Sequence, residues 1–172
     1  MLKKKGFSQV VSTVVLITLT VAAIAAVLVV VRNYVSVGLN SASACNDILD
    51  KVKINPDYTC FDSTTNSTLV SISRNQFAMD SLLVSISYTD SGKTFYLKNT
   101  AENISGVKYY SESGSAQGAV ALPKNESGVT YCVNETNSAP DSIQIAPKRG
   151  GTQCSVVDTF NNVPTCIPSI HC

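Results

Sequence analysis

The sequence has few charged residues, and the two signs nearly balance. Only 15% of the residues are charged, with 13 Lys and Arg against 12 Asp and Glu, a formal net charge of +1. A chain without a broad basic surface is not expected to bind nucleic acid. Its solubility must come largely from abundant Ser, Thr and Asn, which suits an exported protein better than a cytosolic one.

Residues suited to catalysis or metal binding are also scarce. Histidine occurs once, at His171, which excludes an ordinary Ser-His-Asp or Cys-His arrangement unless the C-terminal tail supplies it. The sequence has no C-x-x-C pair and no glycine-rich phosphate-binding motif. We therefore expect no enzymatic activity, no metal and no cofactor.

One long apolar segment dominates the N-terminal quarter. Residues 10–31 contain no charged residue, glycine or proline. As a helix rising about 1.5 Å per residue, this run is about 30 Å long, the thickness of the hydrocarbon core of a bilayer. Lys3, Lys4 and Lys5 precede the run and only Arg32 follows it, so the N-terminus is predicted to stay in the cytoplasm and the rest to be exported.

Three interpretations of this segment compete. It could be a plain single-span anchor. It could be a secretory signal, for which Ala23-Ile24-Ala25 supplies a small-x-small pattern, although the apolar run continues to Val31, beyond the point where a removed signal ends. In the third interpretation the chain is cut before the apolar stretch, because the basic cluster is followed by Gly6 and Phe7 and only then by the helix.

The third arrangement resembles the class III signal of type IV pilins, which a prepilin peptidase cuts after the glycine. The stretch 4–16, KKGFSQVVSTVVL, is similar to the N-terminus of archaeal pilins in particular. Bacterial pilins usually carry Glu at the fifth mature position, where this chain has Val11. The resemblance covers about the first 35 residues and implies a leader 1–6, a cut between Gly6 and Phe7, and a retained helix.

The resemblance also implies partners and a location. The precursor would lie in the cell membrane and meet the prepilin peptidase and the pilus assembly machinery. After the lysines are removed, the apolar helix is easier to extract from lipid, and in water it must bury its surface against copies of itself. Contacts related by rotation and rise do not close, so the expected product is an extracellular homopolymer held by N-terminal helices.

The remainder of the chain reads as short strands, and the expected fold class is α+β. We place the helix and its continuation at 7–50, with the helix ending near Cys45 to Asp50, and an all-β head at 51–172. Alternating apolar and polar residues predict strands, at 68–73, 81–88, 94–98, 106–110, 119–122, 129–133, 142–146 and 153–157. So many short strands favour an immunoglobulin-like sandwich, which the stretch 96–107 also resembles.

All six cysteines follow the apolar run, on the side where disulfides form. Six cysteines allow 15 pairings; we expect Cys45 to pair with Cys60 and the other four, Cys132, Cys154, Cys166 and Cys172, to pair among themselves.

Four N-glycosylation acceptor triplets fall in the same exported region. They begin at Asn66, Asn103, Asn125 and Asn134.

Three functions fit these features. The first is an adhesive surface filament of the pilin kind. The second is a membrane-anchored extracellular immunoglobulin-like binding module that keeps its lysines. The third is an archaellin, the subunit of a motility filament, which shares the same N-terminal signature.

Overall fold

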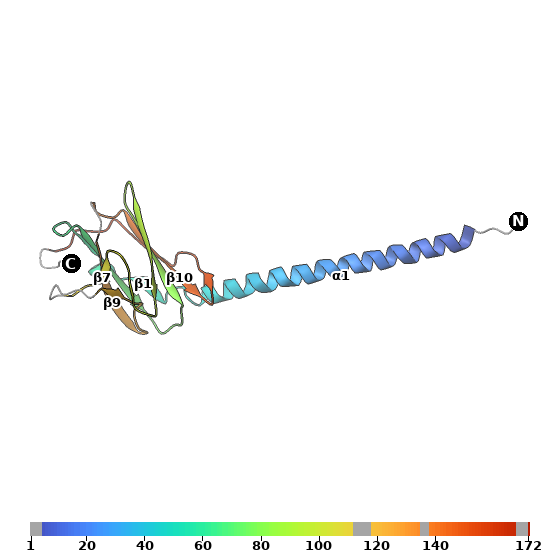
Figure 1. Ribbon diagram of the computed structural model, residues 1–172, viewed down its shortest axis with the longest axis horizontal. Helices are drawn as coiled ribbons and strands as arrows, with labels where there is room; N and C mark the ends of the chain where they lie inside the picture. Colours follow the sequence, from blue (N-terminus) through green and yellow to red (C-terminus); the bar gives the residue numbers. More distant parts are fainter. Residues whose placement is uncertain (1–4, 112–117, 135–137, 168–171) are drawn as a thin grey trace. The chain divides into compact units, whose positions relative to one another are not determined.

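A computed structural model of the chain describes residues 5–111, 118–134, 138–167 and 172 (Figure 1). The chain divides into two compact units, Met1–Ser43 and Ala44–Cys172. The first unit is almost entirely the helix α1, which runs from Lys5 to Asn46 and ends within the predicted interval. Valine and isoleucine are mediocre helix formers in water. A run of them as long as this one is helical chiefly in lipid, where every backbone amide must pair within the helix.

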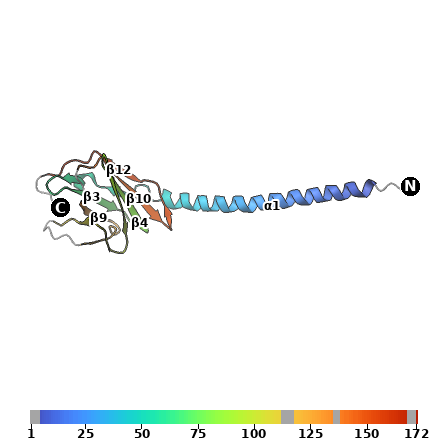
Figure 2. The same cartoon turned by 45° about the horizontal axis from the view of Figure 1, so that its top comes forward.

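The unit that begins at Ala44 is built from antiparallel sheets. The first sheet has the strand order β1 (Val52–Ile54), β3 (Ser67–Arg74), β9 (Ser127–Asn134), β7 (Val107–Tyr109), with β2 (Cys60–Asp62) also beside β3. The second has the order β11 (Thr152–Gln153), β10 (Ser142–Arg149), β4 (Ser81–Ser87), β5 (Gly92–Lys98), with β12 (Asp158–Asn161) also beside β10 (Figure 2). A small third sheet pairs β6 (Glu102–Asn103) with β8 (Ala119–Val120).

Alternating side chains of the two large sheets form one hydrophobic core. On β3, Val70 and Ile72 are no more than 1% exposed, and Val84 on β4 and Ile145 on β10 are fully buried. All four belong to a single cluster of buried residues. The sheets thus share one core, as the layers of a β-sandwich do. The predicted α+β class is confirmed, whereas the immunoglobulin-like arrangement stays a prediction.

Five predicted strands match long strands of this core. The predicted strands at 68–73, 81–88, 94–98, 129–133 and 142–146 correspond to β3, β4, β5, β9 and β10. The continuous strand predicted at 153–157 is wrong: β11 ends at Gln153 and β12 begins at Asp158. Between them Cys154 N donates to Pro147 O and Val157 N to Ile145 O, so the segment follows the edge of β10 as an irregular connection.

The edge of β3 is formed by two short strands that the sequence analysis missed. β1 pairs with the C-terminal part of β3 and β2 with its N-terminal part, and a 3-10 turn, Pro56–Tyr58, lies between them. Thr59, 1% exposed, bridges this interruption because its hydroxyl accepts from Ser71 N at 3.1 Å and donates to Asn55 O at 2.7 Å. A side chain therefore replaces the missing ladder bond.

The disulfides join Cys45 to Cys154, Cys60 to Cys166 and Cys132 to Cys172. The expected Cys45–Cys60 pair, with the other four cysteines among themselves, is therefore wrong. Cys60 on β2 lies beside Leu69 of β3, which lies beside Cys132 of β9, and the three form a second small core.

The C-terminal segment covers this second core. Phe61 N donates to Pro164 O and Cys166 N to Phe61 O, which brings Cys166 alongside Cys60. Cys45 and Cys60 are close in the sequence but do not pair. The pairing follows from which cysteines lie next to each other once the strands have paired.

Substitution of Thr59 tests the bridge at the sheet edge. We expect Thr59→Val to lower the free energy of unfolding of the head by about 1–3 kcal/mol, because it leaves the buried Ser71 N–H without an acceptor. Thr59→Ser keeps the hydroxyl and should cost clearly less. Urea unfolding followed by tyrosine fluorescence measures both, and equal losses in the two variants would contradict the role given to the hydroxyl.

Peptide mapping without reduction tests the connectivity. After proteolysis we expect linked peptides that contain Cys45 with Cys154, Cys60 with Cys166 and Cys132 with Cys172. A peptide linking Cys45 to Cys60 would contradict the fold, since it would require Cys60 to leave the outer side of the first sheet.

Candidate functional site: the exposed apolar helix

The most unusual surface of the chain belongs to α1. Residues Val10–Val35 form a 26-residue helical segment that is long and apolar enough to cross a membrane, and none of these residues is buried. Large apolar side chains are exposed along its length, from Val10 at 63% to Val35 at 51%. In a helix packed on its own domain, one face would be covered and the opposite face polar. Between Val10 and Val31 apolar side chains point to every side of the helix, and each of these residues is exposed.

The few polar side chains within this span do not interrupt its apolar character. The hydroxyls of Thr13, Thr18 and Thr20 donate to the carbonyls of Val10, Val15 and Ile17 at 2.8–2.9 Å. Each hydroxyl is therefore satisfied within its own helix and does not need water or a partner. The helix can lie in lipid or against apolar side chains without leaving these donors unpaired.

Arg32 is the one charged residue between Lys5 and Asp47. It follows the apolar run directly and is exposed. At the edge of a bilayer its long side chain can extend toward the polar layer, so it is compatible with a membrane-spanning helix. The same guanidinium would need a hydrogen-bonding partner if neighbouring helices surrounded it.

The predicted processing site lies in the first turn of α1. The helix begins at Lys5, so Gly6 and Phe7 have helical backbone, while Lys3 and Lys4 lie outside the described residues. The first four amides of a helix have no carbonyl partner within it, and this turn opens more easily than the interior. A peptidase could therefore bind the 6–7 bond without unwinding the apolar run.

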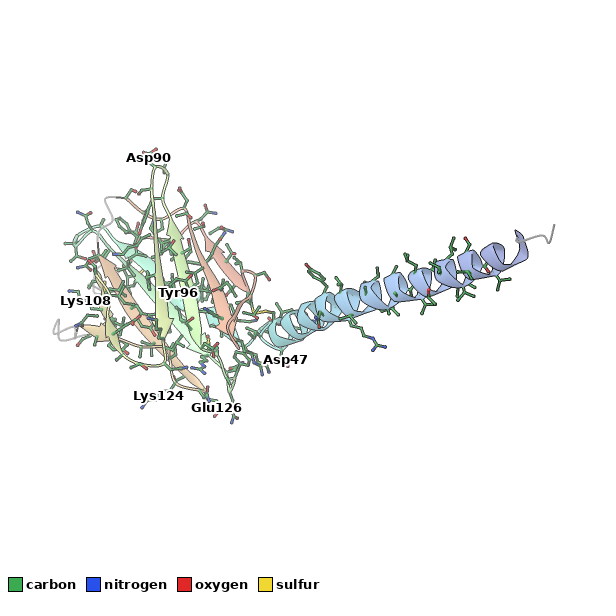
Figure 3. The ribbon with its side chains drawn as sticks, turned by 45° about the vertical axis from the view of Figure 1, so that its right-hand side comes forward. Asp47, Asp90, Tyr96, Lys108, Lys124 and Glu126 are labelled. Carbon is green, nitrogen blue, oxygen red and sulfur yellow. A yellow bond between two sulfur atoms is a disulfide. The ribbon has the colours of Figure 1, made fainter. Side chains whose placement is uncertain are left out.

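Three of the four sequon asparagines are exposed. Asn66 is the last residue of the turn after β2 and has a left-handed φ of 49°. Asn103 lies on β6. Asn125 lies between Lys124 and Glu126, which Figure 3 labels at the rim of the head. Asn134 ends β9, and its side chain is half-buried with Oδ1 enclosed. Glycosylation stays a prediction at all four.

A buried arginine that the sequence analysis overlooked supports the loop of Asn125. Arg74, only 7% exposed, donates to Phe77 O and, at 3.0 Å, to Pro123 O. Burial lowers the pKa of its guanidinium. An arginine at the end of an alternating strand resembles an ordinary surface residue, so the sequence contained no signal for this role.

Metal ligands do not gather in the part of the chain that the structure describes. No group of three or more His, Cys, Asp or Glu side chains in that part could hold a metal ion. All six cysteines are in disulfides, and His171 lies outside the described residues.

Comparison with protein-family models, with curated proteins and with solved structures finds no match for this chain.

Removal of α1 tests whether it alone causes association. A chain that starts at Ala44, exported behind a cleavable secretion signal, should be monomeric in size-exclusion chromatography without detergent, because its apolar residues are packed in its own core. The full chain should fractionate with membranes or large assemblies. Detergent-dependent behaviour of the shortened chain would contradict this assignment.

Proposed function

We propose that this chain is the structural subunit of a surface filament of the archaeal type IV pilin kind, and not an enzyme. The observation that carries the proposal is the helix Val10–Val35, apolar on all sides and buried on none. Such a helix needs two apolar environments in succession. The bilayer provides the first, and the same helices of neighbouring copies provide the second.

The size of the exposed surface explains why the helix cannot remain free in water. A helix of 26 residues is a cylinder about 39 Å long and about 10 Å wide, with about 1,200 Å² of lateral surface. At about 25 cal/mol per Å², burying that surface contributes about 30 kcal/mol before the cost of ordering the subunits. A contribution of this size is enough to drive assembly.

The leader explains how one helix can occupy both environments. Lys3, Lys4 and Lys5 hold the N-terminus on the cytoplasmic side, because moving ammonium groups through hydrocarbon is costly. Cutting after Gly6 removes all three lysine side chains and leaves the new α-amino group of Phe7 as the one cationic group before the apolar run. The proposed partners are therefore a prepilin peptidase, an assembly machinery that extracts the helix, and further copies of this chain.

The head suits the exterior of such a filament. Its three disulfides require an oxidising compartment, which agrees with export of everything beyond α1. Its outward strand residues are polar but mostly uncharged, as at Ser85, Thr94 and Gln144. We propose that this coat serves surface attachment, with glycans on the exposed sequons.

The mature N-terminus and the state of assembly test the proposal together. We expect mass spectrometry of the surface-isolated protein to find Phe7 as the first residue, and electron microscopy of the same fraction to show fibres. Gly6→Leu should block the cut, because the peptidase would meet a large side chain before the bond, and should abolish fibres. Gly38→Ala, in the same helix and away from the bond, should leave both unchanged.

The alternatives predict different results. A protein that begins at Met1 or Leu2 and forms no fibres would overturn the proposal in favour of a membrane-anchored binding module. Fibres whose loss stops swimming without reducing attachment would identify a motility filament of the archaellin kind.

A further inference from the structure

We infer that adjacent subunits are set in register by an intermolecular ion pair between Arg32 of one copy and Asp47 of another. The inference rests on the proposed filament and adds to it a specific polar contact. Hydrophobic packing is not directional, so uniformly apolar helices can slide along one another. One charge in an otherwise apolar helix can fix the axial offset, in the way that a single polar position fixes the register of coiled coils.

Arg32 is the charge that needs a partner. It lies on one face of α1 with Leu28 and Val35, which are 54% and 51% exposed. In a bundle of such helices this face is covered by a neighbour. A guanidinium removed from water without a partner costs several kcal/mol, so packing is favourable only where the neighbour presents an anion or carbonyl groups.

Asp47 is the first acidic residue of the whole chain and directly follows the last residue of α1. Its side chain is 75% exposed (Figure 3), and its ion pair among the described residues, with Arg149, has an N–O distance of 3.7 Å. That distance is longer than a hydrogen bond, so the carboxylate keeps its capacity to accept from a second cation. Asp50, the next acidic residue, instead contacts Lys53 at 3.0 Å.

The two residues are fifteen positions apart in the sequence (47 − 32 = 15), which corresponds to about four turns, or about 22 Å, of α-helix. A second copy shifted by about 22 Å along the helix axis brings its Asp47 level with the first copy's Arg32. The exposed Leu49, two residues after Asp47 and 52% exposed, offers apolar surface beside the pair.

Charge exchange tests the pair. We expect Arg32→Glu and Asp47→Arg each to reduce the yield of fibres at least about tenfold, because each places like charges together in the interface. The double variant R32E/D47R should restore fibres to near the wild-type yield. Asp90→Arg, which changes a carboxylate at the tip of the β4–β5 hairpin, far from Asp47 in Figure 3, is the matched control and should assemble normally.

Export and folding are measured in every variant. The membrane content of the chain and the three disulfides should equal those of the wild type, so that loss of fibres reports assembly. R32E adds no positive charge on the outer side and does not oppose the predicted orientation. If wild-type fibres form and Asp90→Arg assembles normally but the double variant fails to recover, the ion pair is wrong and the filament proposal stands. If the wild type forms no fibres, the filament proposal itself fails.

A chemical cross-link locates the partner directly. Arg32→Lys keeps the charge and should assemble, and a zero-length carbodiimide can then join the introduced amine to a contacting carboxylate with loss of water. We expect mass spectrometry of the fibres to find position 32 linked to Asp47 of another copy. A link to Asp50 or to another carboxylate, or none, would overturn the assignment.

Discussion

The constraint on which the rest of this protein depends is that the large apolar side chains of α1 between Val10 and Val35 are not buried by the described residues. Over Val10–Val35 every large apolar side chain is about half exposed or more. The free energy of this surface is as large as the stability of many domains. The length and apolar composition of the helix suit the interior of a membrane, and the filament that we propose would supply a second apolar environment.

The head meets the opposite requirement, to be stable without help. Its two large sheets bury one continuous core that includes Val70, Val84 and Ile145, and disulfides tie distant parts of the chain together. The Cys45–Cys154 bond closes a loop with a sequence separation of 109 between the end of α1 and the connection after β11. Closing so long a loop restricts the unfolded chain strongly, and disulfides of this kind are typical of proteins in oxidising compartments.

Periodic signals predicted the elements that carry the core. The alternation of apolar and polar residues identified β3, β4 and β5. In β4 and β5 one face is more buried than the other, whereas β3 is buried on both faces, because Leu69 lies in the second small core. The short strands β1 and β2 escaped detection since each has three residues, too few for a period to show. Arg74 and Thr59 escaped for another reason: their roles depend on carbonyls and amides that are brought to them by other parts of the fold.

The amino-acid sequence by itself determined the apolar helix and the β-rich class of the head, and it predicts the basic leader and the export of the cysteines. These are properties of composition and order, and they follow from how single residues interact with water and lipid. Only the tertiary structure decided which cysteines pair, which sequon is half-buried, and that Asp47 keeps an accessible carboxylate. Those outcomes depend on which strands become neighbours. Strand pairing brings together residues that are far apart in the sequence, and their spacing along the chain does not predict which of them will meet.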